Sequence, residues 1–227
     1  MPSEGDGEPD FPLLLTSTEG KAWVCKVSIT RGTGQRSILP KLDREGMESM
    51  HAAITFVCIH ATTIQEWLRV PLVPPAVKPP ALFNRETDLA VMLGEVDTAK
   101  AGNSGSACAA LALIAHLARL TEVGGGKGVA VTGSVDLRGR INPVDGIKEK
   151  CSNAQSLELG MMIIPQLNYQ LLMRDGFSGW PDGLRSYAQG AMKPASDMLD
   201  VMQLVIPGEI QEKCLSHACD TDGTQWR

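Results

Sequence analysis

The segment from Ser106 to Leu120 is the feature that most constrains the fold of this 227-residue chain. It reads SACAALALIAHLARL, a helical pattern that is apolar on almost every side. A helix of that kind is buried, so the other elements must surround it. Glycines at 124 to 126 should end it. We therefore expect a packed domain with this helix near its centre.

Segments with strand and helix patterns alternate along the chain. Strands are expected at 21–30, within 31–39 after a glycine turn, and at 87–93, 128–132, 134–141, 161–164 and 200–206. Helices are expected at 43–68, 106–120, 146–159 and 209–217, with a proline-rich connector at 70–80 and an irregular segment at 167–195. This alternation indicates an α+β (α/β-like) fold in which small mixed sheets pack with helices.

The composition narrows the class of protein. The length fits one domain, which we place at 11–217 between an acidic tail at 1–10 and a C-terminal tail at 218–227. The cysteines at 25, 58, 108, 151, 214 and 219 form no closely spaced pair, and no H-E-x-x-H occurs, so no metal or cofactor is expected. A net charge of −5 without a basic run argues against nucleic acid as a partner. No apolar run reaches the roughly 18 residues of a membrane span.

Small residues immediately precede the apolar helix, in the order Gly102, Asn103, Ser104, Gly105 and Ser106. They would let a peptide approach the backbone closely, and N–H groups at a helix start can stabilise an oxyanion. Ser104 is therefore a candidate nucleophile, with the backbone of Asn103, Ser104 and Gly105 as candidate oxyanion donors. Ser and Asn are also ordinary helix caps, which explains the segment without catalysis.

The run from Thr132 to Lys150, TGSVDLRGRINPVDGIKEK, is more specific. It resembles the proteolytic domain of the Lon family of Ser/Lys proteases, in which T-G-x-x-x-L-R-G-x-x-x-P-x-x-G-x-K-E-K carries the catalytic lysine. Residues 100–106, KAGNSGS, are similar to the K-D-G-P-S-A-G signature of that family. The resemblance implies a Lon-like fold and a serine endopeptidase. It places the nucleophile at Ser104, the lysine at Lys148 and the threonine that contacts the lysine at Thr132.

The chain also departs from the family signature. Ala101, Asn103 and Ser106 replace its aspartate, proline and second glycine, so Ser106 is an alternative nucleophile. A catalytically inactive Lon-like domain that binds peptides or serves assembly is the alternative function. The sequence contains no ATPase module, in which it is similar to the stand-alone birnavirus proteases. That similarity implies polyprotein processing and, for a viral chain, the host cytoplasm; the acidic N-terminus, unlike a secretory signal, favours a cytoplasmic location in either case.

The choice of lysine rests on two arguments that disagree. A lysine with its ordinary pKa of about 10.4 is neutral in only about one molecule in 2,500 at pH 7, so a base requires a lowered pKa. Lys148 is favoured by the family resemblance and by the helix dipole in the first turn of 146–159. The apolar positions 147, 151, 154 and 157 place Lys150 inside the buried stripe, and this pattern alone favours Lys150. Without catalysis, either residue would be an ordinary surface lysine whose amine reaches solvent.

The implied substrate is an extended peptide or polyprotein that adds to an exposed strand edge. Neither a nucleic acid nor a membrane is an expected partner. The sequence leaves the cleavage specificity and the oligomeric state open.

Overall fold

The computed structural model describes residues 13–16, 22–31, 33–39, 41–69, 87–94, 102–118, 120, 123–124 and 128–206. The strands are β1 (Leu13–Thr16), β2 (Ala22–Arg31), β3 (Arg36–Leu39), β4 (Thr87–Leu93), β5 (Val129–Val131), β6 (Ser134–Val135), β7 (Ile141–Asn142), β8 (Met161–Pro165) and β9 (Met192–Ala195). The helices are α1 (Arg44–Ile59), α2 (Ala61–Leu68), α3 (Ser106–Leu117), α4 (Ile147–Ser156), α5 (Gln166–Asp175), α6 (Asp182–Ala191) and α7 (Met198–Val205). None of the helices in these ranges has the length and apolar character needed to cross a membrane.

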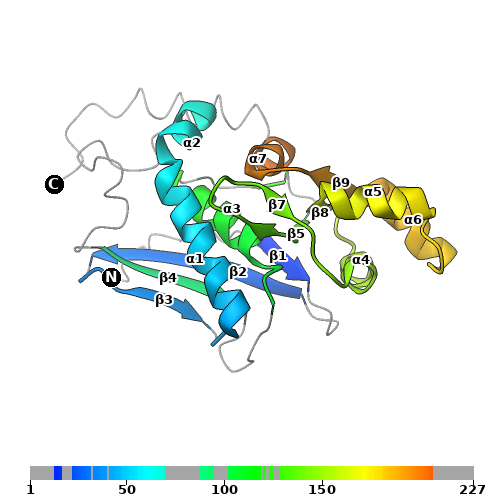
Figure 1. Ribbon diagram of the computed structural model, residues 1–227, viewed down its shortest axis with the longest axis horizontal. Helices are drawn as coiled ribbons and strands as arrows, with labels where there is room; N and C mark the ends of the chain where they lie inside the picture. The colour runs from blue at the N-terminus through cyan, green and yellow to red at the C-terminus, as the bar shows by residue number, and fades with distance from the viewer. Residues whose placement is uncertain are drawn as a thin grey trace, which may run out of the picture.

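Within the described ranges, seven strands form one mixed sheet in the order β3-β4-β2-β1-β5-β8-β9 (Figure 1). β2 pairs antiparallel with β1 and β4, whereas β3/β4, β1/β5, β5/β8 and β8/β9 are parallel. A separate antiparallel hairpin is made by β6 and β7. Helices and a mixed sheet thus build the expected α+β fold.

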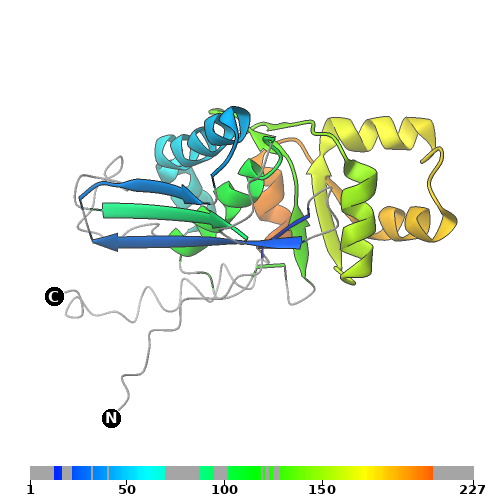
Figure 2. The ribbon, with the colours of Figure 1, turned by 90° about the horizontal axis from the view of Figure 1, so that it is seen from below.

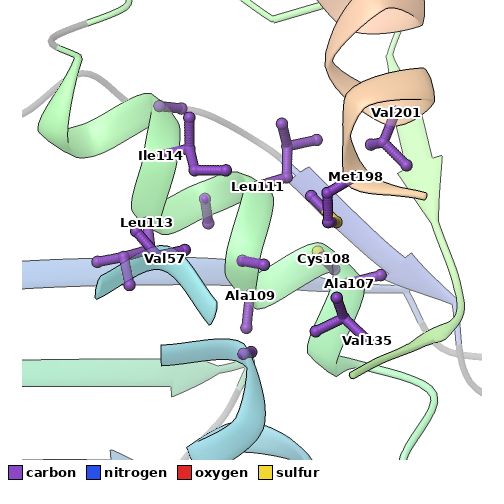
Figure 3. Packing of buried hydrophobic residues seen from close by; sticks show 14 of the residues in the cluster. Val57, Ala107, Cys108, Ala109, Leu111, Leu113, Ile114, Val135, Met198 and Val201 are labelled. Atoms are coloured by element: carbon purple, nitrogen blue, oxygen red, sulfur yellow. The ribbon is translucent and has the colours of Figure 1, made fainter. Parts of the chain in front are cut away.

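Helix α3 lies at the centre of the larger of the two hydrophobic cores that the described residues form. It packs against α1, α7 and strands β1, β2 and β5, and every residue from Ser106 to Ala115 is buried. Figure 2 shows α1 and α3 on the same side of strands β2, β3 and β4. In the close view of Figure 3, Leu113 of α3 lies near Val57 of α1, while Leu111 faces Met198 of α7. The prediction of a buried central helix is confirmed.

The second core lies on the other face of the sheet at its β5-β8-β9 end. Successive residues of a strand point to opposite faces. Val131 and Ile163 therefore belong to the core around α3, whereas Ala130, Met162 and Ile164 pack with α4 and α6. Strands β5 and β8 thus separate two packed layers of side chains, one around α3 and one around α4 and α6.

Several predicted elements match the structure closely. β4 has the predicted bounds, and the helix predicted at 43–68 is present but divided at His60 into α1 and α2. The strand predicted at 134–141 is instead the two strands of the β6–β7 hairpin. The connector at 70–80, the helix at 209–217 and the two predicted tails lie outside the described residues.

Two predicted elements are wrong. Residues 167–195 are not irregular, because they contain most of α5, all of α6 and β9. Pro165 and Pro181 stand immediately before the two helices, and Gly176 ends α5 in a left-handed conformation, so these residues punctuate short helices. The strand predicted at 200–206 is helix α7, whose buried residues recur at helical spacing and whose N-cap is the Asp197 side chain.

Candidate active site

Four side chains mark the candidate site, because they are the buried polar or charged ones in the described part of the chain. Their exposed fractions are 7% for Ser49, 0% for Ser106, 1% for Thr132 and 3% for Lys150. They come from α1, α3, the end of β5 and α4. Buried polar groups require hydrogen-bonding partners. Ser49 and Thr132 donate to carbonyl oxygens of the loop that carries Ser104, Lys150 donates to Thr132, and Ser106 bonds to β6.

Ser104 lies in the turn just before α3 and is half-buried. Its carbonyl oxygen accepts a hydrogen bond from the Gly133 N–H at 2.9 Å. The Thr132 hydroxyl donates to the same oxygen at 3.4 Å. These contacts hold the backbone of Ser104 directly against the segment that follows β5.

Lys150 also contacts this segment. Its Nζ donates to Thr132 Oγ1 at 3.2 Å and to the Asp145 carbonyl oxygen at 2.9 Å. Burial lowers the pKa of Lys150 to about 8, against the opposing effect of the charges on Asp145 and Glu149. With that pKa about one molecule in ten carries a neutral amine at pH 7. Thr132 therefore links a lysine of altered basicity to the backbone of Ser104.

Lys148 does not make the contact that we expected of it. Its Nζ donates to the carbonyl oxygen of Gly179, in the connection between α5 and α6, at 2.6 Å. The amine bonded to Thr132 belongs to Lys150 instead. Residues two positions apart on a helix point in different directions, so both lysines of α4 cannot face Thr132. The expected Thr132–Lys148 contact is corrected to Thr132–Lys150, the choice that the apolar stripe favoured.

Ser106, the alternative nucleophile, has a structural partner. Its side chain is fully buried, and its Oγ accepts a hydrogen bond from the Val135 N–H at 2.9 Å. This bond ties the first residue of α3 to β6. Ser104, in contrast, is partly exposed.

The predicted oxyanion donors are the backbone N–H groups of Asn103, Ser104 and Gly105. The next two N–H groups along the chain are already engaged, since Ser106 donates to Asn103 O at 3.3 Å and Ala107 donates to Gly133 O at 3.2 Å. The role of the three earlier groups stays a prediction. Within the described ranges, no group of His, Cys, Asp or Glu side chains is arranged to hold a metal ion.

Comparison with known families decides the relationship of the chain. Residues 11–206 match the model of the Lon protease (S16) C-terminal proteolytic domain. The chain belongs to this family. The resemblance seen in the Thr132–Lys150 run is thereby confirmed, together with the Lon-like α+β fold.

Curated Lon proteases share moderate identity with this Lon domain. The Lon protease of Brevibacillus choshinensis is 30% identical over 156 residues, which cover 69% of this chain and 18% of that protein. Lon protease 1 of Thermus thermophilus is 28% identical over 172 residues, which cover 74% of this chain and 20% of that protein. The Lon protease of Azospirillum brasilense is 29% identical over 215 residues, which cover 90% of this chain and 24% of that protein. The chain thus spans about a fifth of the length of the curated relatives it matches.

Sequence reasoning missed the part that α1 plays at the site. Its N-terminal residues Asp43, Glu45 and Ser49 contact the loop before α3. The available signal was the small size of two residues on the buried stripe of the helix. Gly46 and Ser49 precede Ala53 and Ile54 at three- and four-residue spacing, and small residues there permit close approach of another segment.

Proposed function

We propose that this Lon domain is a serine endopeptidase in which Ser104 is the nucleophile and Lys150 the general base. The observation that carries the proposal is the buried Lys150 amine, hydrogen-bonded to a Thr132 hydroxyl that itself contacts Ser104. A neutral amine with a pKa near 8 is suited to general-base work near neutral pH. Lys150 takes the role first assigned to Lys148, whose amine is bound elsewhere.

The reaction is an acyl transfer in two stages. Neutral Lys150 accepts the proton of the Ser104 hydroxyl while Ser104 Oγ forms a bond to the peptide carbonyl carbon. Backbone N–H groups of residues 103–105 bind the resulting oxyanion. The Lys150 ammonium then gives its proton to the leaving amine as the peptide bond breaks. Water, deprotonated by Lys150, hydrolyses the ester and restores both residues.

Thr132 contributes orientation to this reaction. Its hydroxyl accepts from Lys150 and donates to Ser104 O, so one side chain fixes the amine relative to the nucleophile loop. The Asp145 carbonyl oxygen accepts a second amine proton. When Lys150 is neutral, its two N–H groups are directed at these acceptors and its lone pair is left for the Ser104 proton.

The substrate that fits the proposal is an extended polypeptide, either part of the chain's own precursor or another protein. An extended chain can pair with an exposed sheet edge, and β3 and β9 are the outer strands of the described sheet. We propose no cofactor for the reaction, because serine and lysine together supply its nucleophile, base and acid.

The test is labelling with a fluorophosphonate, which phosphonylates activated serines: the serine Oγ forms a bond to phosphorus and fluoride leaves. The wild type should be labelled on Ser104, and Ser104→Ala should abolish labelling. Lys150→Met should lower the labelling rate at least a hundredfold, whereas Lys148→Met should leave it within about twofold. Ser106→Ala keeps Ser104 and should still be labelled.

Three outcomes would contradict the proposal. Loss of labelling only in Ser106→Ala would move the nucleophile to Ser106. Loss only in Lys148→Met would restore the lysine first expected. An unlabelled wild type between pH 7 and pH 10 would indicate the inactive, peptide-binding domain instead.

A further inference from the structure

The first two turns of α1 contact the loop that carries Ser104. The carboxylate of Asp43 caps α1, since its Oδ1 accepts from the Gly46 N–H at 2.8 Å. The same carboxylate accepts from the Gly102 N–H, with 3.1 Å to Oδ2. Asp43 therefore joins two functions in one side chain: it begins a helix and fixes the loop two residues before the nucleophile.

Asn103, the residue adjacent to Ser104, is held twice by the same helix. Its side-chain Nδ2 donates to Glu45 Oε1 at 2.8 Å. Its carbonyl oxygen accepts from Ser49 Oγ at 3.0 Å, and Ser49 is buried. Ser49 Oγ also lies 3.5 Å from Ser134 Oγ, so it connects the loop to β6.

Gly46 permits this close approach. A Cβ at residue 46 would lie 2.9 Å from Asp43 Oδ1 and 3.1 Å from Gly102 O. Contacts that short would force the loop and the carboxylate to shift away from α1. The absence of a side chain at residue 46 thus leaves the space in which the loop packs against the helix.

These contacts replace a covalent restraint. Asn103 stands where the family signature has a proline, whose ring fixes the backbone angle φ. Asparagine has no such restraint, and the hydrogen bonds from α1 act on this residue and on Gly102. We name Asp43, Glu45, Gly46 and Ser49 the α1 cradle.

We propose that Asp43 and Ser49 are positioning residues, which act through the α1 cradle to hold Gly102 and Asn103 so that Ser104 faces Lys150. The inference rests on the proposed function, because it assigns the cradle a role in the acylation of Ser104. Displacing a nucleophile by about 1 Å can slow its reaction about a hundredfold. The cradle therefore sets a reaction rate in addition to stabilising the fold.

The test separates helix capping from positioning. Serine caps helices about as well as aspartate but has a shorter side chain with one oxygen, so Asp43→Ser keeps the cap and loses the Gly102 contact. Ser49→Ala removes the other contact. Asp197→Ser is the matched control, because Asp197 caps α7 by accepting from the Asp200 N–H at 3.0 Å and makes no contact with the Ser104 loop among the described hydrogen bonds.

Fluorophosphonate labelling of Ser104 should be about tenfold slower in Asp43→Ser and in Ser49→Ala. Asp197→Ser should label at the wild-type rate, and thermal unfolding should show Asp43→Ser folded at the assay temperature. Asp43→Asn, which keeps one carbonyl oxygen at the right reach, should recover part of the rate. Rates equal to wild type in both cradle variants would overturn the inference and leave the proposed function intact.

A second measurement needs no activity. The Gly102 amide should exchange with deuterium about tenfold faster in Asp43→Ser than in the wild type or in Asp197→Ser. An unchanged exchange rate of the Gly102 amide in Asp43→Ser would show that Asp43 does not hold the loop and would overturn the inference. An unlabelled wild type with faster Gly102 exchange in Asp43→Ser would refute the proposed function and keep the contact between α1 and the loop.

Discussion

At the scale of single residues, the candidate site contains a buried amine whose pKa is lowered. A lysine that folds into an apolar environment binds its proton less tightly than it does in the unfolded chain. Below pH 8 the lysine is protonated in both the native and the unfolded state, and burial of its charge destabilises the native state by the full desolvation penalty. As the pH rises from about 8 to about 10.4, the native state loses its proton first, so stability increases across this range.

Replacing Lys150 by methionine should therefore stabilise the protein at pH 7. Methionine has a similar length and no charge, and we expect a gain of about 1–2 kcal/mol in the free energy of unfolding after the lost hydrogen bonds are counted. The advantage over wild type should disappear between pH 8 and pH 10. Urea unfolding of both proteins at pH 7 and pH 10 measures this, and the difference between them cancels other titrating groups. A constant difference across this range would contradict the lowered pKa.

Thr132 gives a second prediction at this scale. Thr132→Val keeps the shape of the side chain but removes the oxygen that accepts from Lys150 and donates to Ser104. The labelling rate of Ser104 should fall about tenfold, and Thr132→Ser should retain most of it. If valine labels as fast as threonine, the hydroxyl does not orient the amine.

At the scale of elements, sequence periodicity predicted the central features of the site. The apolar run after Ser104 gave α3, and the stripe through residues 147–157 indicated that Lys150 is buried. The family motif instead selected Lys148. A motif match does not show which of the two lysines is buried, and in the structure it is Lys150. The second contact of Asp43 could not be predicted, because a carboxylate that caps a helix shows no sign in sequence of another partner 59 residues away.

The errors in the C-terminal half have a similar physical origin. Helices α5 and α6 are short and lie between prolines and glycines that also occur in loops. No residue of α5 is buried, so its sequence carries no strong apolar stripe. Helix α7 has eight residues rich in Val, Leu and Met, and over so short a run periods of two and 3.6 are difficult to distinguish.

The turn between β5 and β6 should tolerate no side chain at Gly133. Its φ is 153°, and a Cβ would lie 2.5 Å from Ile141 Cγ2. Gly133 also donates to Ser104 O, so Gly133→Ala should shift both Thr132 and the nucleophile loop. We expect a loss of about 2 kcal/mol in stability and a slower labelling rate.

Gly176→Ala is the matched control for this substitution. Gly176 also has a positive φ, of 60°, but nothing lies within 4 Å of its added Cβ. It should lose stability through backbone strain alone and keep the labelling rate. Equal effects of the two variants on labelling would show that the Gly133 turn does not position the site.

At the scale of the whole molecule, the site lies where the two cores meet. Ser104 precedes α3 of the larger core, whereas Lys150 belongs to α4, whose residues Ile147 and Cys151 lie in the second core. Thr132, at the end of β5, contacts both. Thr132 thus connects Lys150 of one core to the backbone of Ser104 beside the other.

The two cores should therefore unfold together. Met162 is fully buried in the second core, and Met162→Ala should lower the free energy of unfolding by about 2–5 kcal/mol. Met162 is remote from Ser104 in sequence. Even so, the variant should lose Ser104 labelling and helical circular dichroism at one and the same urea concentration, which should be lower than in the wild type. Two separate transitions would show that the cores unfold independently.

The pH dependence of Ser104 labelling tests the central claim most directly, because it reports the protonation of the base in the folded protein. The rate in the wild type should rise with pH through a single ionisation near pH 8 and reach a plateau above it. The same profile should persist in Lys148→Met and be absent in Lys150→Met. A profile that rises only near pH 10.4, or one that is unchanged in Lys150→Met, would contradict the account.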